Sequence, residues 1–105
     1  MKLTDLVQAL RNLDTAAQLV AKEAPEMEMI DMYMKDELDL NADIRFFDGE
    51  EVDGLYIEVD GIKYVNVFPL EMAQNLVRDF MKLYGPDATN ETLAKRLLQY
   101  RFNDA

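Results

Sequence analysis

The chain has no cysteine, histidine, serine or tryptophan among its 105 residues. Without cysteine, neither a disulfide framework nor a thiolate metal site can form. Without histidine and serine, Ser–His and Cys–His nucleophile pairs are impossible, and the commonest general base near neutral pH is missing. Histidine-based zinc and iron sites are excluded for the same reason. We therefore expect a protein that is not an enzyme and that carries no cofactor.

Phosphate-binding loops and long apolar runs are missing as well. The glycines at positions 49, 54, 61 and 85 fit neither G-x-G-x-x-G nor P-loop spacing. No run of about 18 apolar residues is present, and an amphipathic pattern follows Lys2 where a signal peptide would be continuously apolar. We expect no membrane association and a cytoplasmic, reducing location. The length and the apolar half of the composition suit one domain over residues 1–105.

Acidic residues outnumber basic ones 21 to 11, and the formal net charge is −10. The imbalance is concentrated, because residues 1–60 carry a net charge of −11 and residues 61–105 a net charge of +1. Between Asp36 and Asp60, ten acids are opposed by Arg45 alone. Such a surface repels nucleic acid and anionic lipid and attracts basic partners or cations. A solvated acidic face that only maintains solubility accounts for the same composition.

Two helices are expected in the first third of the chain. Apolar residues recur at three- and four-residue steps over residues 4–24, which predicts a helix capped by Thr4 and ended by Pro25. Residues 26–38 also favour a helix, because one face would collect four apolar side chains. Alternating Glu and Met at the start of this segment could instead begin a strand. The four apolar residues are Met27, Ile30, Met34 and Leu38.

The middle of the chain predicts a three-stranded antiparallel β-meander. Asp60-Gly61 is a two-residue hairpin signal between two alternating segments. In the last strand, Tyr64, Asn66 and Phe68 are expected on one face; if Asn66 is exposed, the assigned register is shifted by one residue. The expected strands are residues 44–47, 55–59 and 62–68.

Two further helices are predicted at the C-terminal end, which gives an α+β fold with helices packed mainly on one face of the sheet. The first begins at Pro69 and ends at Gly85, and the second begins near Thr89 or Asn90 and runs to about residue 102. The second carries the chain's only evident basic cluster, which consists of Lys95, Arg96 and Arg101.

The acidic stretch is the best candidate for a functional surface. It predicts a small binding protein of the inhibitor, immunity, chaperone-like or nucleic-acid-mimic type, whose partner is a basic protein. A homo-oligomeric assembly module, such as a homodimer formed through an exposed sheet edge, is the alternative. The residues expected to bind the partner are Asp36, Glu37, Asp39, Asp43, Asp48, Glu50, Glu51 and Asp53.

One spacing within this stretch is similar to that of a calcium loop. Asp39, Asn41 and Asp43 alternate, and Glu50 follows at the twelfth position, where an EF-hand loop places its last ligand. Ile44 stands where the sharp turn normally needs glycine, and a strand is expected after Glu50 where the motif requires a helix. Calcium binding is therefore a second alternative, and no other metal site is indicated.

Overall fold

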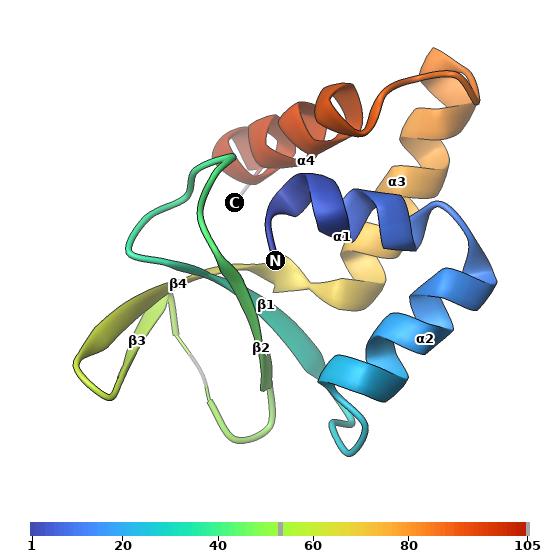
Figure 1. Cartoon of the computed structure of the whole chain (residues 1–105). Coiled ribbons are helices and arrows are strands. Elements are labelled where there is room, and N and C mark those ends of the chain that lie inside the picture. The colour runs from blue at the N-terminus through green and yellow to red at the C-terminus, as the bar shows by residue number, and fades with distance from the viewer. Residues whose placement is uncertain (53, 105) are drawn as a thin grey trace.

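The computed structural model describes all residues except Asp53 and Ala105. Two N-terminal helices, a four-stranded antiparallel sheet and two C-terminal helices follow one another along the chain, so the α+β class is confirmed (Figure 1). The sheet has four strands where three were expected. The elements are α1 (Leu3–Leu10), α2 (Leu13–Glu23), β1 (Ile30–Lys35), β2 (Ile44–Asp48), β3 (Tyr56–Val59), β4 (Ile62–Pro69), α3 (Leu70–Tyr84) and α4 (Asn90–Asp104).

The N-terminal segment forms two helices in place of the single helix predicted over residues 4–24. The chain leaves α1 at Asn12, whose side-chain oxygen accepts hydrogen bonds from the backbone N–H groups of Asp14 (2.8 Å) and Thr15 (3.4 Å). An asparagine that bonds the backbone in this way starts a new helix and does not extend the old one. The amphipathic pattern is continuous across the break, which is why periodicity alone missed it.

The predicted cap of the first helix is also wrong. α1 begins at Leu3, so Thr4 lies inside the helix and Lys2 occupies the N-cap. The Asp5 carboxylate accepts a hydrogen bond from the Lys2 backbone N–H (2.9 Å), which satisfies this end of the helix from within its first turn.

The prediction of a helix over residues 26–38 is wrong, because β1 runs from Ile30 to Lys35 in the interior of the sheet. Met32 and Met34 join the core beneath the helices, whereas Tyr33, which is also fully buried, points to the other face. A strand that is buried on both faces has apolar side chains at almost every position. Its sequence therefore lacks the alternation of apolar and polar residues by which a strand is recognised.

The strands follow the spatial order β2-β1-β4-β3, so the predicted meander of consecutive neighbours is wrong. β2 pairs with β1 and not with β3, so the β3–β4 hairpin is the only one of the expected pairings that the sheet contains. That hairpin is confirmed: Asp60 (φ 54°) and Gly61 (φ 79°) form the two-residue turn, and Val59 lies opposite Ile62. Positive φ at both turn positions matches the right-handed twist of the flanking strands.

A β-bulge changes the phase of β4. Tyr33 pairs with Asn66 and Asp31 with Pro69, so Val67 and Phe68 together lie opposite the single residue between Tyr33 and Asp31. Both bulged side chains reach the core. The prediction that Phe68 shares a face with Asn66 is therefore wrong, and Asn66 itself is half-buried on the face opposite the helices.

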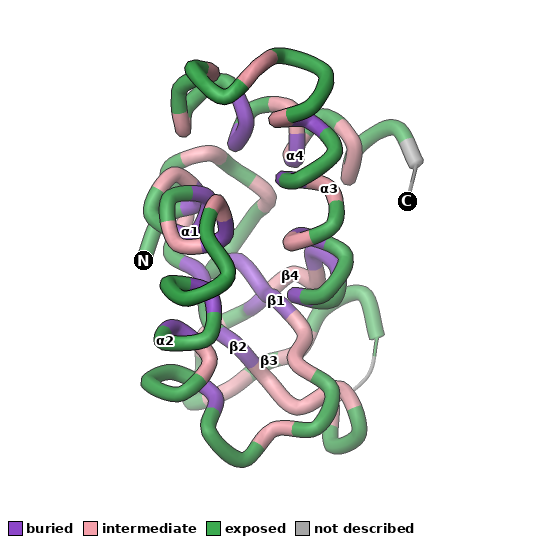
Figure 2. Tube along the Cα trace, turned by 90° about the vertical axis from the view of Figure 1, so that its right-hand side faces the viewer, coloured by how far each residue is buried: buried purple, intermediate pink, exposed green. Residues whose placement is uncertain are grey.

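The two C-terminal helices are confirmed. Thr89 caps α4 by accepting a hydrogen bond from the Thr92 N–H (3.1 Å), and Gly85 ends α3 with a φ of 94°. α1, α3 and α4 pack against one another, and α3 also packs on β1 and β4. Buried residues concentrate between this helical layer and the sheet (Figure 2). The core includes Leu6, Val7, Met32, Met34, Val77, Leu93 and Leu97.

Candidate functional site

The acidic residues predicted to bind a partner lie at the two ends of β2. Four of them belong to the β1–β2 connection, and three follow at or just beyond Asp48. All seven are exposed except Asp48, which is half-buried, and the eighth, Asp53, lies outside the described residues. A five-residue strand spans roughly 16 Å, so the two groups stand apart. The first group is Asp36, Glu37, Asp39 and Asp43, and the second is Asp48, Glu50 and Glu51.

β2 is an edge strand, so one row of its backbone groups faces away from the sheet. The Lys35 N–H donates a hydrogen bond to the Asp43 carbonyl (2.9 Å), so the backbone groups of Asp43 face β1. Because backbone groups alternate in direction along a strand, those of Ile44 and Phe46 point away from the sheet, although their side chains are buried. The Ile44 N–H donates to the Met1 carbonyl (2.8 Å). We therefore find the open part of this edge at Phe46, between the N-terminal residue and the turn that follows β2.

Few basic residues neutralise this surface. The Lys2 ammonium group lies 2.8 Å from the Asp43 carboxylate, and this hydrogen bond and charge hold the pKa of Asp43 below its ordinary value. Within the part of the chain that the structure describes, none of the other six acids forms an ion pair.

Arg45, the only base between Asp36 and Asp60, is directed at aromatic rings and not at these acids. Its guanidinium carbon lies 4.8 Å from the centre of the Phe47 ring and 5.5 Å from that of Tyr64. It also donates a weak hydrogen bond to the Tyr64 hydroxyl (3.4 Å). Tyr33 packs edge-on against Phe47 and extends this cluster on the face of the sheet opposite the helices.

The four residues with calcium-loop spacing do not converge. Asp39, Asn41 and Asp43 lie before β2, and Glu50 lies beyond its other end. The Asp39 carboxylate accepts a hydrogen bond from the Asn41 N–H (3.3 Å), as in a local turn, and Asp43 is paired with Lys2. Among the described residues, no group of three or more acidic side chains is placed to hold a metal ion. A strand inside the loop is what separates the ligands.

The three bases of the cluster predicted from the sequence also have separate partners in the structure. Lys95 pairs with Glu91 one turn earlier (3.2 Å). Arg96 stacks on Phe80, with its guanidinium carbon 5.0 Å from the ring centre. The Arg101 guanidinium donates to the Asn66 carbonyl (3.1 and 3.2 Å), which lies where the β3–β4 ladder ends. Arg96 and Arg101 therefore connect α4 to α3 and to β4, Lys95 pairs within α4, and the three bases do not share an anion site.

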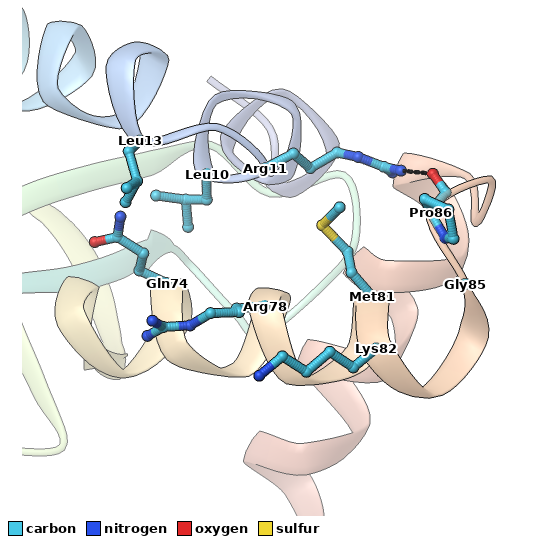
Figure 3. A pocket seen from close by; sticks show the side chains of 9 residues that line it. All are labelled: Leu10, Arg11, Leu13, Gln74, Arg78, Met81, Lys82, Gly85 and Pro86. Carbon is cyan, nitrogen blue, oxygen red and sulfur yellow. Dashed lines mark hydrogen bonds between the residues drawn. The ribbon is translucent and has the colours of Figure 1, made fainter.

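A different set of bases, which sequence reasoning missed, meets at a pocket of about 500 Å³ between the α1–α2 junction and α3. Leu10 and Leu13 lie across the pocket from the α3 side chains of Arg78 and Lys82 (Figure 3). Arg11, which is distant from both of them in the sequence, completes a group of three cations. The one available signal was the four-residue spacing of Arg78 and Lys82, which puts both on one helix face.

Arg11 is the best-anchored of these bases. Its guanidinium donates to the carbonyl oxygens of Pro86 (2.7 Å) and Ala88 (2.6 Å) and to the Asn90 side-chain oxygen (3.1 Å). All three acceptors are neutral, so the positive charge of Arg11 is retained at the pocket wall. The same bonds attach the end of α1 to the loop between α3 and α4.

No helix in the described part of the chain is both long and apolar enough to cross a bilayer. No protein-family model, curated protein or solved structure matches this chain, so the proposals below rest on its own residues and geometry.

Proposed function

We propose that this chain is a non-enzymatic binding protein that engages a basic protein through the acidic ends of β2. We call this surface the acidic edge and define it as Asp36, Glu37, Asp39, Asp43, Asp48, Glu50 and Glu51 with the strand between them. The observation that carries the proposal is that two groups of largely unpaired acids flank a strand at the edge of the sheet.

The geometry suits an extended basic segment. Such a segment laid along β2 would meet outward backbone groups at Phe46 and carboxylates at both ends. Opposite charges raise the association rate and make binding sensitive to salt. Arg45 keeps its positive charge, but its guanidinium lies against Phe47 and Tyr64 and pairs with none of the described acids of this surface.

The test compares two triple variants with equal net charge. One carries Glu37→Gln, Glu50→Gln and Glu51→Gln in the acidic edge, and the control removes three exposed acids of the C-terminal half. Each immobilised protein is presented to source-cell lysate at low and high salt, and captured proteins are identified and quantified. The control changes are Glu71→Gln, Asp79→Asn and Asp87→Asn.

We expect a basic protein to be captured by the parent and the control at low salt, and to be lost from the acidic-edge variant and at high salt. Equal capture by the two triple variants would show that net charge alone attracts the partner. Capture that is insensitive to salt would place the interface elsewhere.

Self-association is a second candidate, favoured by the opposite edge of the sheet. β3 is the other edge strand; its first residue, Tyr56, is 64% exposed, and Leu55 directly before it is 69% exposed. Apolar side chains on an unpaired edge favour pairing with a second copy. Sedimentation should then show a dimer that Leu55→Lys dissociates and Leu83→Lys, at an equally exposed position on α3, leaves intact. A strict monomer at high parent concentration contradicts this candidate.

A further inference from the structure

The pocket between the α1–α2 junction and α3 has a charge opposite to that of the chain around it. Three of its nine lining residues are basic and none is acidic, although acids outnumber bases 21 to 11 overall. Screening limits the reach of distant charges to about 8 Å at physiological salt. A ligand inside the pocket therefore responds mainly to these nearby cations.

The positive charges are not neutralised by carboxylates. Within the described residues, Arg11, Arg78 and Lys82 take part in no ion pair. The Arg78 guanidinium donates to the side-chain oxygen of Asn75, and the acceptors of Arg11 are also neutral. The pocket is therefore suited to a negatively charged group supplied from outside.

The remaining walls are mostly apolar. Leu10 and Met81 form part of the wall between the helices, and Leu13 stands at the pocket with 76% of its surface exposed. Methionine adapts its shape to what it contacts, which favours a flexible apolar ligand. The volume lies within the range of pockets that hold small molecules.

We infer that this pocket binds a small amphipathic carboxylate, a monoanion with an aliphatic tail. The tail lies against Leu10, Leu13 and Met81, and the carboxylate is bound by Arg78 and Lys82. These two bases are one helical turn apart on α3 and lie on the same side of the pocket (Figure 3), so both reach one head group. The planar guanidinium matches a carboxylate with two parallel hydrogen bonds.

The probes are octanoate, 1-octanol and inorganic phosphate, titrated separately while the NMR signals of the Leu13 and Met81 methyl groups are followed. Octanoate should shift both signals saturably. Octanol lacks the charge and phosphate lacks the tail, so each should bind at least about tenfold more weakly. Absence of octanoate binding, or binding of either comparator as tightly as octanoate, would overturn the inference.

Variants then locate the binding. Arg78→Gln with Lys82→Gln should weaken octanoate binding at least about tenfold, whereas Lys22→Gln with Lys35→Gln, which changes net charge equally at exposed sites elsewhere, should have little effect. Leu13→Gln removes an exposed apolar contact and should also weaken binding. Equal affinities in the two double variants contradict the site. No lining residue belongs to β2, so this result is independent of the acidic-edge proposal.

Discussion

Arg11 shows how much one side chain can contribute when its partners come from distant segments. Its guanidinium holds the carbonyls of Pro86 and Ala88, which the fold brings beside it from 75 and 77 positions away in sequence. Each hydrogen bond to a charged donor contributes a net stabilisation of about 1.5–3 kcal/mol. Arg11 therefore links the end of α1 to the loop between α3 and α4.

We expect Arg11→Met to lower the free energy of unfolding by about 2–3 kcal/mol, because charged hydrogen bonds are lost and two carbonyls lose their donor. Urea denaturation measures the change. Arg78→Met is the matched control, since Arg78 is exposed and bonds only the nearby Asn75 side chain; it should stay within about 0.5 kcal/mol. Equal losses in the two variants would mean that this link is not what stabilises this region.

Asp43 predicts a small pH-dependent contribution to stability. The Lys2 ammonium lowers the pKa of Asp43 in the folded state, so the ion pair stabilises the fold above the unfolded-state pKa of about 4. That contribution is lost as the pH falls through the lowered pKa.

Asp43→Asn should therefore melt slightly below the parent at about pH 7, and the difference should vanish at about pH 2. Melting curves of both proteins at the two pH values decide this. The comparison cancels the loss of general acidic repulsion at low pH, because that occurs in both proteins. A difference that persists unchanged in acid would have a cause other than the ion pair.

At the scale of elements, the residues of the β3–β4 turn are of the types that its backbone conformation requires. Asp60 and Gly61 both have positive φ, a conformation that costs a side-chain-bearing residue roughly 1–2 kcal/mol unless it is Asn or Asp. Gly61→Ala should therefore destabilise the protein by about that amount in chemical denaturation. Asp60→Asn keeps a residue that tolerates this conformation and should be close to neutral. If Gly61→Ala is also neutral, the hairpin does not limit stability.

Elements with a local signal were predictable from the sequence, and those decided by tertiary contacts were not. The Asp60-Gly61 turn, the Gly85 helix end and the two C-terminal helices have signals within a few residues. The division of the N-terminal helix depends on whether Asn12 bonds the backbone, which competes with an unbroken amphipathic pattern. β1 was misread because the strands that pair with its two edges, β2 and β4, lie later in the chain, and because side chains on both of its faces are buried.

The candidate sites divide in the same way. The negative charge of the acidic edge could be predicted from the sequence. The placement of its two groups at the ends of an edge strand could not, because it depends on the order of the strands in the sheet. The calcium-loop spacing does not bring its four residues together, because β2 lies between Asp43 and Glu50. The pocket could not be predicted from the sequence, because Arg11 comes to line the same pocket as Arg78 and Lys82 only when the helices pack.

At the scale of the whole molecule, the net charge of −10 is a source of repulsion within the fold. Because most of the described acids of the acidic edge are unpaired, added salt should screen them from one another. We expect the melting temperature to rise by several degrees between about 20 mM and 500 mM sodium chloride. Sodium chloride is used because sulfate would also strengthen apolar burial.

The acidic-edge triple variant provides the check on this prediction. With three acids neutralised, it should melt above the parent at low salt and respond less to added salt. A parent melting temperature that falls with salt would mean that favourable charge pairs outweigh the repulsion.

The packing of α1 against α4 has a consequence for how the protein is made. The two helices come from opposite ends of the chain, and Gln8 accepts a hydrogen bond from Asn90, 82 residues later (2.6 Å). Chains emerge from the ribosome N-terminus first, so α1 is available long before its partner exists. α1 can pack against α2 and α3 earlier, but it lacks its contacts with α4 until residues 90–104 have been made. We expect a nascent chain that stalls before α4 to expose apolar surface of α1, to which a chaperone can bind.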